Sequence, residues 1–115
     1  MSTPSIPTVC DLSGFTAEER DRLQELGRSA VGLAAEVHER SDGYGLRYPD
    51  ASAELLLGLA EFIALDRRCC AFVGHAVVSE PATGTVWLEL TAPAGAAAAI
   101  DAEVLRFVPT SVPRS

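Results

Sequence analysis

Residues 72–90 have the sequence FVGHAVVSEPATGTVWLEL, and this segment decides the fold. In its second half the apolar residues Val86, Leu88 and Leu90 alternate with Trp87 and Glu89, which is typical of a strand with one buried face. The first half is rich in valine and ends at a Pro-Ala-Thr-Gly connection. The segment therefore predicts a β-hairpin, with strands over residues 72–79 and 86–90.

A buried helix is predicted just before this hairpin. Apolar residues recur at helical spacing from Leu55 to Cys70, and Asp50 or Ser52 is suited to cap the first turn. Further upstream, Tyr44, Leu46 and Tyr48 alternate with Gly45 and Arg47 after a Ser-Asp-Gly turn. That pattern predicts one more strand, with one apolar face.

The N-terminal half predicts one long helix over residues 17–39. Thr16 and Glu19 have the spacing of a capping box, in which each side chain bonds to the backbone of the other residue. An apolar face follows at steps of three and four, formed by Leu23, Leu26, Ala30, Leu33 and Val37. Gly27 and Gly32 are expected to weaken this helix by about 1 kcal/mol each relative to alanine.

The order helix, strand, helix, strand, strand, helix predicts an α+β fold, a two-layer sandwich with a small three-stranded sheet. The last helix is expected over residues 96–107. At 115 residues the chain has the length of a single domain. Residues 1–9 contain two prolines and no periodicity and are expected to form a mobile arm, and residues 109–115 a tail.

The amino-acid composition argues against several classes of function. The net charge is −7, and nine arginines are scattered among sixteen carboxylates, so nucleic acid is not an expected partner. The chain has no lysine, which excludes Schiff-base and phosphate-loop lysine chemistry. No signal peptide and no apolar run of about 18 residues is evident, so no membrane partner is expected. Three cysteines without a secretion signal are therefore predicted to be reduced thiols in the cytoplasm.

The strongest candidate for chemistry is the cysteine pair in Asp66-Arg67-Arg68-Cys69-Cys70-Ala71-Phe72. A permanent disulfide between Cys69 and Cys70 is not expected, because neighbouring Cα atoms about 3.8 Å apart strain such a bridge. The two thiols can converge on one ion if the helix ends at or before Cys70, since side chains at i and i+1 of a helix diverge by about 100°. Cys10 is then the candidate third sulfur, and thiolates favour soft ions.

Charges near the pair have opposing effects. Arg67 and Arg68 favour a thiolate, whereas Asp66 and the helix C-terminus oppose it, and the sequence does not rank them. His75, five residues after Cys70, is a candidate ligand or thiol base if the hairpin folds back, although a lone strand histidine is more often at a surface or satisfied position. His38 is expected to interact with carbonyls at the end of the first helix.

At this motif the chain resembles a family of small bacterial proteins of unassigned activity that carry an acidic-x-x-Cys-Cys-Pro-Phe motif. The resemblance extends to an early cysteine at Cys10, an Asp-Gly-Tyr turn at residues 42–44 and a Val-Trp-Leu strand at residues 86–88. Some members accompany regulators of the response to mercury or other heavy metals. The resemblance implies that Asp66, Cys69, Cys70 and Phe72 are motif residues. Ala71 replaces the family's proline, which would end the helix sharply.

Three hypotheses for function follow. The first is a cytoplasmic protein that binds a soft metal or metalloid (mercury, arsenic or copper class) through Cys69, Cys70 and Cys10, with Asp66 and His75 as supporting groups. The second is a thiol redox or transfer enzyme that uses the cysteine pair. The third is a protein-interaction module in which the cysteines are structural and Trp87 lies on an outer surface. A homodimer is compatible with each, since symmetric dimers are the commonest oligomers.

Overall fold

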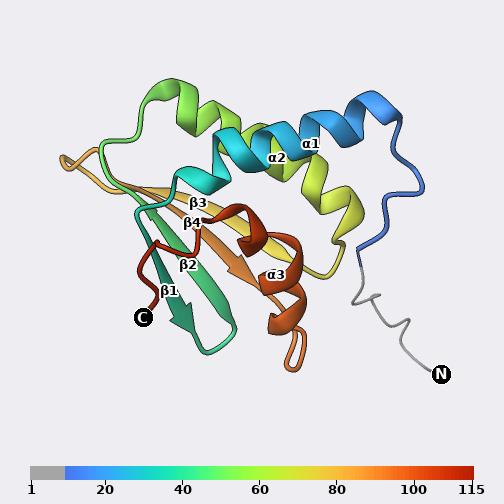
Figure 1. Ribbon diagram of the computed structural model, residues 1–115. Helices are drawn as coiled ribbons and strands as arrows, with labels where there is room; N and C mark the ends of the chain where they lie inside the picture. The colour runs from blue at the N-terminus through green and yellow to red at the C-terminus, as the bar shows by residue number, and fades with distance from the viewer. Residues whose placement is uncertain (1–9) are drawn as a thin grey trace.

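A computed structural model describes residues 10–115, which form an α+β fold of helices over an antiparallel sheet (Figure 1). The predicted arm over residues 1–9 lies outside the described residues. The helices are α1 (Ala17–Ser29), α2 (Ala53–Cys69) and α3 (Ala97–Glu103), with short 3-10 turns η1 (Val31–Leu33) and η2 (Leu105–Phe107). The strands are β1 (Glu36–Arg40), β2 (Gly43–Tyr48), β3 (Gly74–Ser79) and β4 (Val86–Thr91).

The α+β class is confirmed, but the prediction of three strands is wrong. Residues 10–115 contain a four-stranded sheet in the order β1-β2-β4-β3, with every neighbouring pair antiparallel. The predicted hairpin is present as β3 and β4, although β3 begins at Gly74 rather than at residue 72. Val37, Leu46 and Leu88 lie opposite one another across three strands, and all are 0% exposed. One face of the sheet therefore forms the floor of the core.

The long helix predicted over residues 17–39 is also wrong, because α1 ends at Ser29 and the chain re-enters the sheet as β1. Tyr48 helps to fix this change, since its hydroxyl donates a 2.8 Å hydrogen bond to the carbonyl of Val31. His38 accordingly lies in a strand and not at a helix end. The helical spacing of Val37 was misleading, because Val37 gains its burial from pairing with β2, which is a non-local contact.

The C-terminal residues complete the β1 side of the sheet. The amide of Val37 donates to the carbonyl of Pro113 at 2.9 Å, and the amide of Glu39 donates to Ser115 at 2.7 Å. Ser115 returns a bond to the carbonyl of Val37 at 3.0 Å. The predicted tail over residues 109–115 thus covers the free edge of β1, where unpaired backbone groups otherwise invite association.

The helices lie over the core face of the sheet (Figure 1). The predicted capping box of Thr16 and Glu19 is present in α1, and the Ser52 side chain caps α2 by accepting from the amide of Leu55. The helix predicted over residues 96–107 is divided into α3 and the turn η2. No helix among residues 10–115 combines the length and apolar character needed to cross a bilayer.

Candidate functional site

The cysteine pair lies where α2 stops. Cys69 is the last helical residue, and Cys70 leaves the helix with φ −109° and ψ 69°. The helix therefore ends at the pair without a proline at position 71. Because the backbone turns there, the Sγ atoms of Cys69 and Cys70 lie 3.5 Å apart and are not splayed as they are within a helix.

Cys10 reaches this pair from the loop before α1. It forms a disulfide with Cys70 that spans 60 residues of sequence, with a Cα–Cα distance of 4.5 Å. The prediction that all three cysteines are reduced is therefore wrong for this structure, because the fold brings two distant thiols within bonding distance. A separate backbone bond, from the amide of Asp11 to the carbonyl of Cys69 at 2.9 Å, holds the same loop against α2.

The three Sγ atoms form a compact cluster, all within 4.8 Å of one another. Cys69 retains a free thiol and is 5% exposed, and Cys70 is 1% exposed. The structure thus brings together the three residues that the sequence suggested as ligands. Cys10 and Cys70 are covalently bonded to each other, while the 3.5 Å between Cys69 and Cys70 is close to the roughly 3.8 Å that separates two sulfurs on one tetrahedral zinc ion.

A buried acid–histidine pair lies against the cluster. Oδ2 of Asp66 lies 2.7 Å from Nε2 of His75, and the thiol of Cys69 donates to Oδ1 of Asp66 at 3.7 Å. His75 belongs to β3, where it lies opposite Leu90 on the core face. The hairpin therefore does fold back on the end of α2, and His75 contacts the thiol site through Asp66.

The electrostatics of the site favour a neutral thiol at Cys69. Burial is the main cause that raises its pKa to about 12, and the charges of Asp66 and Glu103 raise it further. The guanidinium of Arg68 is turned to Glu19 and packs over the Phe15 ring, 4.3 Å from its centroid. Burial and the nearby carboxylates therefore raise the pKa of Cys69, and the arginines do not lower it below the ordinary value.

A cavity of about 270 Å³ opens beside Cys10, Cys69 and Asp66. The remaining wall comes from the loop before α1, from α1 and α2, and from the C-terminal region, and its residues are Leu12, Leu23, Phe62, Glu103, Arg106 and Phe107. Glu103 and Arg106 were not predicted from the sequence, because no local pattern links α3 and η2 to a cysteine pair more than thirty residues earlier. Cys10 and Cys69 therefore border a cavity with both apolar and charged walls.

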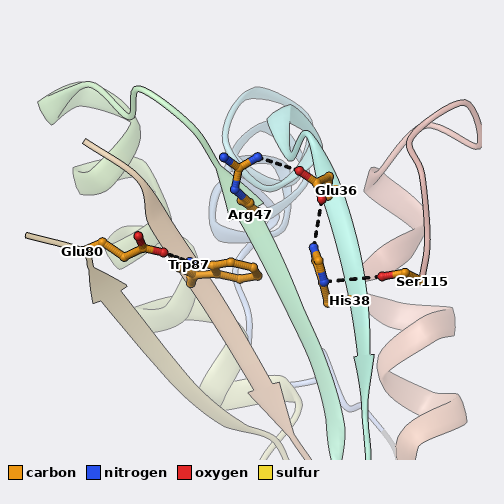
Figure 2. A network of polar contacts seen from close by, with 6 residues as sticks. All are labelled: Glu36, His38, Arg47, Glu80, Trp87 and Ser115. Carbon is orange, nitrogen blue, oxygen red and sulfur yellow. Dashed lines mark hydrogen bonds and ion pairs between the residues drawn. The ribbon is translucent and has the colours of Figure 1, made fainter. Parts of the chain in front are cut away.

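The opposite face of the sheet carries a separate polar network (Figure 2). His38 lies between Glu36 and Ser115, with its Nε2 3.0 Å from Oε1 of Glu36. Its ring packs edge-on against Trp87, at 5.1 Å between centroids. Trp87 donates from its indole nitrogen to Glu80, while Arg47 pairs with Glu36. Because these side chains use their hydrogen-bonding groups on one another, we interpret His38 and Trp87 as structural residues of this face.

Comparisons of the chain with protein-family models, with curated proteins and with solved structures each return no match.

Proposed function

We propose that the protein binds a soft metal or metalloid ion in the cytoplasm through the sulfurs of Cys10, Cys69 and Cys70. The observation that carries this proposal is the convergence of three Sγ atoms within 4.8 Å, from segments far apart in sequence. Thiolate sulfur selects soft ions over hard ones such as magnesium and calcium. The burial of Cys69 and Cys70 also protects a bound ion from competing water.

Binding requires the reduced protein, because the Cys10–Cys70 disulfide occupies two of the three sulfurs. Two electrons and two protons from a cellular dithiol convert that disulfide into two thiols, and cytosolic thiols are maintained in that state. The amide of Asp11 also donates a 2.9 Å hydrogen bond to the Cys69 carbonyl, a contact separate from the disulfide. It supports a reduced state in which Cys10 stays beside the pair.

Asp66 and His75 support the site without being ligands in this proposal. His75 fixes one carboxylate oxygen of Asp66, so that the other oxygen is directed at the thiol of Cys69. Groups of this kind orient ligand atoms and tune their basicity, and their loss typically weakens metal binding about 10- to 100-fold. Asp66 is also placed to accept the proton that Cys69 loses when an ion binds.

The test is an anaerobic titration of the reduced protein with mercury(II), arsenite, copper(I) and zinc, followed by mass spectrometry of the native protein. One ion retained per chain in the presence of a competing small dithiol is expected. Cys69→Ser and Cys70→Ser should lose it, and Cys10→Ser should bind more weakly. A variant with all three cysteines replaced by serine is the control, and undiminished affinity in that variant would rule the proposal out.

A second candidate function is thiol–disulfide exchange, favoured by one observation. The free Sγ of Cys69 lies 3.5 Å from Cys70, which is part of the disulfide. Attack by a Cys69 thiolate on Cys70 would form a Cys69–Cys70 bond and release Cys10 as a thiolate, with no net oxidation. The raised pKa of Cys69 makes that thiolate scarce, which ranks this function second. A thiol titration in which no cysteine ionises below about 8.5 would exclude it.

A further inference from the structure

Two carboxylates lie near the three sulfurs, each with a basic side chain nearby: His75 lies 2.7 Å from Asp66, and Arg106 shares the cavity wall with Glu103. The carboxylate of Asp66 lies against Cys69, and Glu103 shares the wall of the same cavity. Arg106 is the cation on that wall, where it donates to the carbonyl of Glu103 and to Gln24. Arg68 is paired with Glu19. An ion complex that carries a net charge is disfavoured here, because Cys69 and Cys70 are buried and burial penalises a net charge.

The charge of the complex depends on the valence of the ion. Three thiolates leave a complex with two negative charges around copper(I), one around zinc(II) or mercury(II), and none around a trivalent metalloid. Mercury(II) becomes neutral only if it takes two thiolates and leaves the third sulfur protonated. A buried site that joins all three sulfurs thus fits a trivalent ion best, because that complex is neutral.

We propose that the cargo is a trivalent metalloid hydroxide, the chemical class of arsenous and antimonous acid, and that Cys10 supplies the selectivity for it. This inference rests on the proposed function. The reaction is a condensation in which three S–H bonds and three metalloid–oxygen bonds break, while three metalloid–sulfur and three O–H bonds form. Three water molecules leave, no electrons are transferred, and no net charge enters the site.

The cavity fits such a cargo. Its volume of about 270 Å³ exceeds several-fold the roughly 30 Å³ that one water occupies, so a small hydroxide fits beside Cys10 and Cys69. The hydroxyl groups of a neutral acid can donate to Asp66 before the condensation. The carboxylates of Asp66 and Glu103 disfavour an oxyanion such as arsenate, which carries negative charge at neutral pH.

The test compares arsenite with mercury(II) chloride on the reduced, full-length protein, anaerobically and with glutathione as competitor. Native mass spectrometry gives the composition of each adduct. Cys10→Ser is compared with a second variant, Cys10→Ser combined with Ser79→Cys, which keeps three thiols but moves one to an exposed position on β3. Circular dichroism and retained mercury together show that each variant is folded and keeps the Cys69–Cys70 pair.

Wild type is expected to gain one arsenic and lose three hydrogens per chain. Both variants should lose the arsenic and keep the mercury. An arsenic adduct that has lost only two hydrogens, or equal arsenic retention in Cys10→Ser, overturns the inference. Mercury retention without arsenic retention in the wild type overturns the inference but leaves the proposed function standing. Retention of neither ion overturns both.

Discussion

Nε2 of His75 lies 2.7 Å from Oδ2 of Asp66, and each of the two side chains is 4% exposed. This contact joins β3 to the last turn of α2, so the position of the thiol pair depends on a bond between two elements. It also directs the second oxygen of Asp66 toward Cys69. The pair is thus both a structural tie and the closest polar neighbour of the candidate site.

Removing the Asp66 carboxylate should destabilise the fold. Asp66→Ala leaves a buried histidine without its partner, and the loss of one member of such a pair costs about 3 kcal/mol. Urea unfolding of the oxidised protein measures the change. Asp21→Ala, an exposed carboxylate on α1, is the matched control and should change stability by less than about 0.5 kcal/mol. Equal effects of the two substitutions would contradict a structural role for the Asp66–His75 contact.

The disulfide should contribute measurably to stability. Its 60-residue separation corresponds to about 4 kcal/mol in the chain-entropy description, and measured values are often nearer 2 to 4 kcal/mol. Cys10→Ser should lower the unfolding free energy of the oxidised protein by that amount. A reducing phosphine should lower the wild type similarly and leave Cys10→Ser unchanged. A wild type that is insensitive to the reductant would argue against the bridge.

Cys69 should react slowly with alkylating reagents, with a distinctive pH profile. Its pKa is raised from 9.0 to about 12 by burial first and by Asp66 second, so the thiolate fraction keeps growing well beyond pH 9. In the oxidised protein, the rate of iodoacetamide modification should rise about tenfold per pH unit up to pH 10 without a plateau. A rate that levels off between about pH 9 and 10 would show an ordinary thiol.

The raised pKa of Cys69 should also make the stability of the fold depend on pH. The native state holds the Cys69 proton more tightly than the unfolded chain does, so the free energy of unfolding should fall as pH rises from about 9 toward 12. Cys69→Ala removes this dependence. Urea midpoints of wild type and variant at pH 8 and pH 10 provide the measurement. Parallel changes in both proteins would assign the effect to other groups.

Replacement of Tyr48 by phenylalanine should destabilise the fold more than the same replacement of Tyr44. The Tyr48 hydroxyl is buried and donates to the carbonyl of Val31, so Tyr48→Phe leaves that carbonyl unsatisfied at a cost of about 1 to 2 kcal/mol. Tyr44→Phe, at a half-buried position on the same strand, is the control and should cost little. If both variants unfold at the same urea concentration, the Tyr48 bond does not fix the turn after α1.

Gly27 should resist substitution although it lies inside α1. A Cβ at this position would approach the ring of Phe107 to 2.5 Å, whereas one at Gly14 meets nothing within 4 Å. Gly27→Ala should therefore cost about 1 to 3 kcal/mol through overpacking, despite the higher helix propensity of alanine. Gly14→Ala is the control for the change in unfolded-state entropy. A stabilised Gly27→Ala variant would show that Phe107 moves aside freely.

Gly27 also shows how far the sequence could predict this fold. The sequence alone predicts that a glycine weakens helix α1 at this position. The reason to keep a residue without a Cβ is the ring of Phe107, which lies eighty residues away in sequence. In the same way, β1 was misassigned because one apolar residue, Val37, fits helical spacing as well as it fits a strand. Pairing with β2 and with residues 113–115 decides its conformation, and neither contact has a local signal.

By itself, the sequence determined the α+β class, the β3–β4 hairpin, the capped start of α1 and the pair Cys69–Cys70 at a helix end. These features depend on local periodicity, capping and turn residues, which act over a few neighbouring positions. Only the tertiary structure decided that Cys10 bonds to Cys70, that His75 contacts Asp66, and that Glu103 and Arg106 line the cavity. The physical reason is that burial and side-chain pairing join residues across the whole chain, and such contacts exist only after the core has packed.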